Sequence, residues 1–349
     1  MSAPIIETNK WQSSSYDMII DVRSPAEFFN DHIPDAVNMP VLSDSERDIV
    51  GTIYKQQSSF NARKYGAVLV ARNIAEQLEK KLHFMTTDFT PLIHCWRGGQ
   101  RSRAFAQICS EIGWKTFILK GGYKSYRREV LIGLEEISDK LKFVVIAGRT
   151  GSGKTGILHE LINSGSQVLD LEKLAAHRGS LLGAVVNCIQ PSQRLFESHL
   201  YAALMNFDLT KTIYVESESS RIGNIQIPAG VWRQVISAPM IFINTPLQTR
   251  ATYLLSEYEH LMTDPSALEK LIYGMSKRHG NAHTDIWRGL IKSRNWQELA
   301  EDLLKTHYDP AYDRSIRRHN RHLLKEIYQN ECGIDNFRVS ANSILAQAG

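Results

Sequence analysis

Short apolar runs alternate with segments of helical periodicity in the first part of the chain. Residues 16–22, 91–94 and 115–120 are apolar runs bounded by polar or glycine-rich segments, which predicts three buried strands. Residues 66–82 and 102–112 repeat apolar side chains at helical spacing and predict helices. Because strands and helices alternate, we expect a parallel α/β sheet with flanking helices.

Two segments between these elements carry signals of their own. Residues 23–29 predict a helix capped by Ser24, with Pro25 in its first turn and Glu27 three residues after the cap. Residues 45–65 are polar, and we expect them to be partly helical.

The second half of the chain begins with an amphipathic helix predicted over residues 127–142, which connects two expected domains, 1–135 and 136–349. Apolar runs then predict four strands of a second α/β domain, at residues 143–147, 167–172, 212–218 and 240–244. From residue 247 onward the pattern is mainly helical, with an interruption at residues 308–310. We therefore expect a two-domain α/β protein with a helical C-terminal part.

Length and composition fit this division. The chain has 349 residues, more than one hydrophobic core usually organises, and 43% of them are apolar and 22% charged. Its four cysteines lack paired spacing, which argues against a disulfide framework and a cysteine-rich zinc site. The first residues lack a signal-peptide pattern, and no apolar run reaches the roughly 20 residues that a bilayer requires. We expect a cytoplasmic protein without a membrane partner.

The net charge of +4 lies in the second half of the chain. Residues 1–139 hold 17 Lys or Arg and 17 Asp or Glu, whereas residues 140–349 hold 24 and 20. Residues 274–325 hold 11 and 6, a balance that suits RNA and equally suits an ordinary solvated helix face. Cations on more than one helical face predict phosphate contacts by Arg314, Arg317 and Arg318.

The apolar run at residues 91–94 ends at Cys95, which is followed by a polar loop with two glycines and then by a predicted helix. A thiol at that place faces helix N–H groups and the nearby cations Arg97 and Arg101, and both favour the thiolate. An ordinary cysteine is about 3% ionised at pH 7, and a pKa two units lower makes it roughly three-quarters thiolate. We predict that Cys95 is a nucleophile in an anion-binding loop; the alternative is a buried structural cysteine.

The strand predicted at residues 143–147 runs into a G-x-x-x-x-G-K-T sequence that begins at Gly148 and precedes a predicted helix. This is the context that a phosphate-binding loop requires. We expect phosphate or diphosphate to be bound by Gly148, Gly151, Ser152, Gly153, Lys154 and Thr155. Lys154 should contact the outer phosphates, and Thr155 could hold Mg²⁺. The alternative is a fortuitous glycine turn.

Acidic residues follow two strands of the second domain. Asp170 and Glu172 end the second of these strands, and Glu216 and Glu218 end the third. Either pair could supply the acid on the Mg²⁺ side of the phosphate loop or contact substrate, and we favour Glu216 and Glu218. The alternative for both pairs is helix capping and ion pairing.

Two other groups of candidate residues are assigned no chemistry. His279 and His283 could share a helix face as metal ligands, but Gly280 weakens that helix and no Glu stands between them, so we predict no metal site. Cys109 lies on the apolar side of its predicted helix, and we expect it to pack in the core.

Four motifs of the first half together resemble the rhodanese family of sulfurtransferases: Asp21-Val-Arg-Ser-Pro-Ala-Glu-Phe, Asp31-His-Ile-Pro-Asp-Ala-Val-Asn, the Cys95 loop and Leu119-Lys-Gly-Gly-Tyr. The resemblance covers about residues 15–130. It implies a rhodanese-like domain in which Cys95 carries a chalcogen as a persulfide or its selenium counterpart. Arg97 and Arg101 would steer the incoming anion, or either would pair with Asp21 or Glu27 as scaffold.

A rhodanese-like domain joined to a P-loop NTPase-like domain, with three further motifs, resembles the tRNA 2-selenouridine synthase family. The motifs are Asp170-Leu-Glu-Lys-Leu-Ala-Ala-His-Arg-Gly-Ser, Gln190-Pro-Ser-Gln-Arg-Leu-Phe-Glu and Glu216-Ser-Glu-Ser-Ser-Arg-Ile-Gly. Within them, Arg178 and Arg221 are expected to contact phosphate or tRNA. Lys173 and Gln100 stand inside otherwise matching motifs, and the sequence assigns them no role.

The resemblance implies a transferase that acts on the anticodon stem-loop of tRNA. A wobble 2-thiouridine-type base would first be alkylated by geranyl diphosphate, and selenium from selenophosphate would then displace the geranylthio group to give 2-selenouridine. Alkylation makes chemical sense because it turns the sulfur into a group that can depart. Lys154 and its loop would bind the diphosphate, Cys95 would handle selenium, and a selenophosphate-supplying enzyme is an expected partner.

Two other functions stay open at this point. One is a nucleotide-dependent kinase or NTPase with a rhodanese-like regulatory domain. The other is a non-catalytic tRNA-binding module in which Cys95 relays sulfur to a partner. The sequence indicates neither the oligomeric state nor the face that would dock tRNA.

Overall fold

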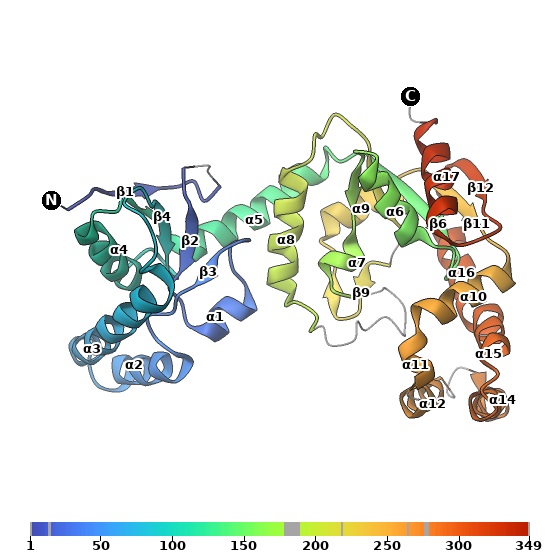
Figure 1. Cartoon of the computed structure of the whole chain (residues 1–349), viewed down its shortest axis with the longest axis horizontal. Coiled ribbons are helices and arrows are strands. Elements are labelled where there is room, and N and C mark those ends of the chain that lie inside the picture. The colour runs from blue at the N-terminus through green and yellow to red at the C-terminus, as the bar shows by residue number, and fades with distance from the viewer. Residues whose placement is uncertain are drawn as a thin grey trace. The chain divides into compact units, whose positions relative to one another are not determined.

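A computed structural model describes residues 2–12, 15–177, 189–217, 219–263, 265–275 and 279–347. The chain forms two compact units, and Figure 1 labels many of their elements. The first comprises Met1–Ile137, Leu174–Asn206 and Ile222–Pro228, and the second comprises Ser138–Lys173, Phe207–Arg221 and Ala229–Gly349. Each unit is organised around its own five-stranded sheet. A domain boundary between residues 135 and 136 stays a prediction.

The sheet of the first unit has the strand order β1-β5-β4-β2-β3, and neighbouring strands pair in parallel. Its strands are β1 (Ile5–Thr8), β2 (Met18–Asp21), β3 (Val37–Asn38), β4 (Pro91–His94) and β5 (Thr116–Leu119). Every residue of β4 is buried, as expected for the central strand of a parallel sheet. The strands predicted from the apolar runs, and their parallel arrangement, are confirmed.

The helices of the first unit are α1 (Pro25–Asn30), α2 (Asp44–Gln56), α3 (Ser59–Gln77), the π-helix η1 (Leu78–Leu82), α4 (Gln100–Ile112), α5 (Gly122–Ser138) and α8 (Gln193–Met205). α1 begins after Ser24 as predicted, and the Ser24 N–H donates to the Glu27 carboxylate (3.2 Å). The helix predicted over residues 66–82 begins earlier, at Ser59, because the Ser58 hydroxyl caps its first turn. The polar segment before it forms α2 and the start of α3, which pack side by side (Figure 1).

Apolar side chains from both the sheet and the helices form the core of the first unit. Ile20, Ile93 and Phe105 are among its fully buried members. Cys109 is also fully buried, which confirms that it packs in the core. Burial raises the pKa of the Cys109 thiol to about 12, so this cysteine stays protonated at neutral pH.

The sheet of the second unit has the order β12-β11-β6-β8-β7, again with parallel neighbours. Its strands are β6 (Phe143–Gly148), β7 (Gln167–Leu169), β8 (Ile213–Glu216), β11 (Met240–Asn244) and β12 (Leu323–Tyr328), while β9 (Arg221–Ile222) and β10 (Ile225–Gln226) pair separately. The prediction of a mainly helical chain from residue 247 missed β12. This strand lies at the sheet edge and buries only Ile327 fully, so it lacks the apolar run that marks the other strands.

The helices of the second unit are α6 (Lys154–Asn163), α7 (Leu171–Leu174), α9 (Ala229–Ser237), α10 (Leu247–Glu257), α11 (Glu259–Thr263), α12 (Pro265–Gly274), α14 (Asn281–Lys292), α15 (Trp296–Leu303), the π-helix η2 (Leu304–Tyr308), α16 (Asp309–His319) and α17 (Ile334–Leu345). The predicted interruption at residues 308–310 is wrong, because η2 passes directly into α16. Pro310 lies in the first turn of α16, where no N–H is needed from it. Glu172, expected at a strand end, lies in α7.

The two histidines considered as metal ligands contact other side chains. His279 Nε2 lies 2.7 Å from His307 Nδ1, and His283 Nε2 lies 2.8 Å from Asp302 Oδ2. Among the residues that the structure describes, no group of three or more His, Cys, Asp or Glu side chains could hold a metal ion. Within the same residues, no helix is both long enough and apolar enough to cross a membrane.

Candidate functional site

In the loop after β4, hydrogen-bonding groups of the loop and of the following helix contact the Cys95 thiol. Cys95 Sγ accepts the N–H of Gly99 (3.3 Å) and lies 3.3 Å from the Ser102 hydroxyl in the first turn of α4. The side chain is buried, with 4% of its surface exposed. Gly98 has a φ of 66°, and a Cβ there would lie 2.7 Å from the Leu119 carbonyl oxygen, so the loop requires glycine at this position. The Gly99 N–H and the Ser102 hydroxyl therefore both contact the thiol within this short loop.

The pKa of Cys95 lies below its ordinary value. Burial raises it, but hydrogen bonds from the hydroxyl and N–H of Ser102 lower it, as do the charge of Arg101 and the N–H of Arg97, and together these outweigh burial. The thiol thus reaches its anionic form at a lower pH than an ordinary cysteine. A thiolate stabilised by N–H groups is the nucleophilic form of cysteine.

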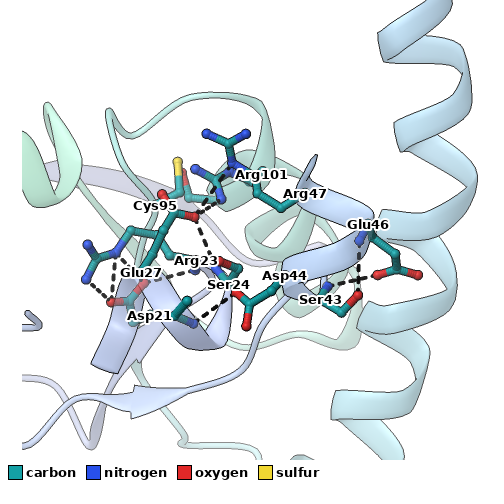
Figure 2. Close-up of polar contacts among 12 residues, drawn as sticks. Asp21, Arg23, Ser24, Glu27, Ser43, Asp44, Glu46, Arg47, Cys95 and Arg101 are labelled. Carbon is teal, nitrogen blue, oxygen red and sulfur yellow. Dashed lines mark hydrogen bonds and ion pairs between the residues drawn. The ribbon is translucent and has the colours of Figure 1, made fainter. Parts of the chain in front are cut away.

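Arg101 is fixed beside Cys95 by a carboxylate from α1. Its Nη1 lies 2.9 Å from Glu27 Oε2, and Arg47 at the start of α2 approaches the same oxygen at 3.8 Å (Figure 2). Burial raises the pKa of Glu27, but the hydrogen bond and charge of Arg101 lower it by more than burial raises it. The carboxylate therefore stays ionised. Arg97 has an exposed side chain. Of the two arginines, Arg101 thus has a scaffold partner as well as an electrostatic effect on the thiol.

A buried polar network beneath the loop was not singled out by sequence reasoning, although its residues stand in the quoted motifs. Arg23 Nη2 lies 2.6 Å from Asp21 Oδ2, and the guanidinium carbon lies 3.9 Å from the centre of the Tyr123 ring. The Tyr123 hydroxyl donates to Asp31 (2.6 Å), and the Tyr123 N–H donates to the Cys95 carbonyl (2.9 Å). This network ties the thiol loop to β2 and α5.

His94, the last residue of β4, is fully buried next to this network. Its Nε2 lies 3.8 Å from Asp21 Oδ2, and neither ring nitrogen has a hydrogen-bond partner among the described residues. Burial lowers the pKa of His94 despite the nearby Asp21 carboxylate, so the ring is neutral at physiological pH. The pKa of Asp21 is lowered, because the charge that His94 carries when it is protonated and the charge and hydrogen bonds of Arg23 outweigh the burial of the carboxylate.

The phosphate loop joins β6 to α6, as its motif predicts. Lys154 Nζ donates to the Gly148 carbonyl (2.7 Å), so the ammonium lies across the loop rather than away from it. Gly153 has a φ of 72°, and a Cβ at this position would meet the Phe337 ring of α17 at 2.3 Å. A Cβ at Gly156 would meet the same ring at 2.4 Å. The loop therefore rests directly on an aromatic ring from the far end of the chain.

α16 also contacts the phosphate loop, through residues that sequence reasoning missed. The Gly148 N–H donates to the Tyr312 hydroxyl (2.7 Å), and Arg149 pairs with Asp313 (2.9 Å). The missed signal is the placement of Tyr312 and two acids, Asp309 and Asp313, within one helical turn of each other. Tyr312 and Asp313 contact Gly148 and Arg149, and each partner lies 164 residues earlier in the chain. A local sequence pattern cannot reveal contacts over that distance.

Arg250 of α10 contacts both α16 and the phosphate loop. Its guanidinium makes two hydrogen bonds of 2.8 Å to the Asp309 carboxylate and donates to the Thr150 carbonyl within the loop (3.1 Å). The Arg250 side chain is 4% exposed. α10, α16 and the phosphate loop are therefore joined by one buried cation.

Of the candidate acids, Glu216 and Asp170 lie close to each other, and Glu216 is next to β6, the strand that leads into the phosphate loop. Glu216 ends β8 beside Ile146 of β6, and its Oε1 accepts the Glu172 N–H (2.8 Å). Its Oε2 accepts no hydrogen bond from the described residues. Burial raises the Glu216 pKa well above its ordinary value, and the neighbouring Asp170 and Glu172 carboxylates raise it further. Glu218 lies outside the described residues.

The remaining candidate residues fall on surfaces. Arg314, Arg317 and Arg318 are exposed on α16, and Arg221 is exposed in β9. Arg178 lies outside the described residues. Their contacts with phosphate or tRNA stay predictions. Two residues without an assigned role are also placed, because Lys173 donates its N–H to Asp170 (2.7 Å) and Gln100 opens α4.

A thiol loop at the carboxyl end of a parallel strand and a phosphate loop between strand and helix define an α/β protein that combines rhodanese-like and P-loop modules. Family models match both parts: a rhodanese-like domain over residues 5–129 and a tRNA 2-selenouridine synthase AAA domain over residues 141–281. The chain belongs to the tRNA 2-selenouridine synthase family, a family of tRNA-modifying enzymes.

Curated relatives align over much of the chain. The tRNA 2-selenouridine synthase of Nitrosomonas europaea is 37% identical over 71% of this chain and 64% of its own length, just under two thirds. That of Psychromonas ingrahamii is 31% identical over 86% of this chain and 88% of its own length. A solved rhodanese-related protein from Thermoplasma volcanium is 20% identical, with 32% of this chain and 77% of that chain covered and a TM-score of 0.21, too low to carry an argument.

Proposed function

We propose that this chain is a transferase that replaces the sulfur of a wobble 2-thiouridine-type base in tRNA by selenium, through an S-geranylated intermediate. Geranyl diphosphate and selenophosphate are the co-substrates. The observation that carries the proposal is the Cys95 thiol, buried in a loop of N–H groups with a lowered pKa, in a chain that also contains a phosphate loop. Membership of the family supports the same conclusion.

The first step suits the phosphate loop. The thiocarbonyl sulfur of the base attacks C1 of geranyl diphosphate, the C–S bond forms, the C–O bond breaks, and diphosphate leaves with its negative charge. The N3 proton of the alkylated base passes to solvent. Lys154 Nζ needs only to exchange the Gly148 carbonyl for a phosphate oxygen to stabilise that leaving group. The N–H groups of the loop would bind the remaining phosphate oxygens.

A Mg²⁺ ion fits beside this loop. Glu216 supplies a buried carboxyl oxygen that accepts no hydrogen bond from the described residues, and burial together with the neighbouring Asp170 and Glu172 carboxylates raises its pKa, so a bound cation would offset their mutual repulsion. Thr155 and Glu216 would hold the ion, together with phosphate oxygens. When bound, the ion would supply positive charge to the diphosphate.

The second step is assigned to the thiol loop. Selenide is released when water takes the phosphoryl group of selenophosphate, and it adds at C2 of the base. The C–Se bond forms, the C–S bond breaks, and the geranylthiol leaves with a proton. The loop N–H groups and Arg101 would hold the selenide anion next to the Cys95 thiol, which would pass the proton from selenium to the departing sulfur without forming an S–Se bond.

The test uses the full chain with a thiolated anticodon stem-loop, geranyl diphosphate and selenophosphate, and follows the nucleosides by mass spectrometry over time. We expect the geranylated nucleoside to rise first and 2-selenouridine to follow. Lys154→Ala should lose geranylation while still converting RNA that is already geranylated. Cys95→Ala should accumulate the geranylated nucleoside.

Other outcomes would reject the assignments one at a time. Geranylation by Lys154→Ala at the normal rate removes the phosphate loop from the first step, and selenouridine formation by Cys95→Ala removes the thiol from the second. RNA-stimulated ATP turnover without prenyl transfer would instead indicate a kinase or NTPase. RNA binding that leaves every nucleoside unchanged would indicate a carrier module.

A further inference from the structure

The paired helices α2 and α3 carry an unusual set of exposed side chains. The stretch from Ile49 to Ala75 has no Asp or Glu, and its four cations are Lys55, Arg63, Lys64 and Arg72, all exposed. Its three aromatic residues are exposed as well: Tyr54 by 63%, Phe60 by 65% and Tyr65 by 45%. Single exposed apolar residues are common, but aromatic rings interleaved with cations of one sign indicate a specific partner.

Part of this set forms a continuous stripe on α3. Phe60, Lys64, Val68 and Arg72 are spaced four residues apart and therefore follow one side of the helix. Apolar and cationic side chains alternate along the stripe, and Val68 is 61% exposed. The residues of α3 that pack inward are different ones, namely Ala62, Gly66, Leu69 and Ile74.

The same helix pair is anchored beside the thiol loop. Arg47 in the first turn of α2 approaches Glu27, the carboxylate that fixes Arg101 next to Cys95 (Figure 2). Asp44 accepts the N–H of Ala26 at the start of α1 (2.9 Å). Because an α-helix rises 1.5 Å per residue, Tyr54 lies only about 10 Å along α2 from Arg47.

We propose that the α2–α3 surface, defined as Tyr54, Phe60, Lys64, Tyr65 and Arg72, binds the unpaired nucleotides of the tRNA anticodon loop. The rings stack on bases and the cations contact phosphates, which is how proteins bind single-stranded RNA. This inference rests on the proposed function, because it supplies the surface that brings the wobble base to Cys95. RNA is favoured over a second copy of the chain, since two such surfaces of one sign repel each other.

The experiment measures binding of the full chain to a labelled anticodon stem-loop as a function of salt. Phe60→Ala with Tyr65→Ala should weaken binding about tenfold or more, because each stacked base contributes measurably. Lys64→Gln with Arg72→Gln should reduce the slope of log K against log salt by about 1.4, the value for two single-strand phosphates. Phe84→Ala, at another ring that is 63% exposed, and Lys10→Gln are matched controls that should change neither quantity.

The outcomes separate this inference from the proposed function. A wild-type chain that neither binds nor modifies the stem-loop would reject the proposed function. A wild-type chain that does both, with surface variants that bind equally well, would reject the α2–α3 surface alone. Variants that bind RNA normally but no longer associate with a selenophosphate-supplying enzyme would assign the surface to a protein and overturn the inference. Unchanged melting temperatures would show that the variants remain folded.

Discussion

The thiol loop and the phosphate loop each combine backbone N–H groups with a nearby cation, but they are held in place differently. Around Cys95 the hydrogen-bonding partners Gly99 and Ser102 lie within seven residues. Around Gly148, by contrast, the contacts come from Tyr312 and Asp313, 164 residues later in the chain. The first pocket is therefore made mostly by its own motif, whereas the second depends on distant helices. A motif can thus specify the chemistry of a site without specifying what supports it.

The largest expected effect breaks the distant support of the phosphate loop. Asp309→Ala leaves the Arg250 guanidinium buried and without its carboxylate, since this pair is only 4% and 16% exposed. We expect the free energy of unfolding of the second unit to fall by about 3 kcal/mol, a drop of roughly 6–12 °C in Tm. Differential scanning calorimetry measures this.

Asp313→Ala is the matched control, because its pair with Arg149 is 34% and 41% exposed. An exposed pair contributes at most about 1 kcal/mol, so this variant should melt close to the wild type. If the two variants lose equal stability, α16 does not support the loop through the buried Arg250.

A substitution at Glu216 is expected to raise stability, by less than Asp309→Ala lowers it. Its pKa is raised by burial and by Asp170 and Glu172, so the folded state holds its proton more tightly than the unfolded state does. Stability is therefore lost as pH rises above the ordinary carboxyl range toward the folded pKa. Glu216→Gln removes this cost, and we expect Tm to rise by about 2–4 °C at pH 8 for roughly 1 kcal/mol.

The pH dependence distinguishes this effect from better packing. The gain in Tm should shrink at pH 5, where the wild-type Glu216 is already protonated. An equal gain at both pH values would show that charge is not its cause. In the wild type, Mg²⁺ should raise Tm more at pH 8 than it does in Glu216→Gln.

The smallest expected effect tests the local hydrogen bond between Ser102 and the Cys95 thiol. Ser102→Ala removes a hydroxyl and its hydrogen bond to Cys95 Sγ, so the Cys95 pKa should rise. Alkylation by iodoacetamide at pH 7 should slow about fivefold, which corresponds to a hydrogen bond of roughly 1 kcal/mol. The pH at half-maximal rate should move upward. A variant with an unchanged pH profile would show that the Ser102 hydroxyl does not contribute to the ionisation of this thiol.

The sequence predicted those parts of the fold and site that depend on nearby residues. The buried strand before Cys95 and the glycine loop before Lys154 both have strong local patterns, and both were found. The edge strand β12 was missed because only Ile327 in it is fully buried. Tyr312 was missed because its role depends on a tertiary contact with Gly148, to which no local pattern refers.

Phe337 beneath Gly153 and Gly156 sets an order of events during protein synthesis. The groups that surround the Cys95 thiol have all been synthesised once α4 is complete, and Tyr123, whose N–H donates to the Cys95 carbonyl, follows soon afterwards. In contrast, the Phe337 ring that packs against the phosphate loop is synthesised nearly two hundred residues after that loop. Pulse-labelled nascent chains should therefore acquire a protected thiol before they acquire any affinity for phosphate.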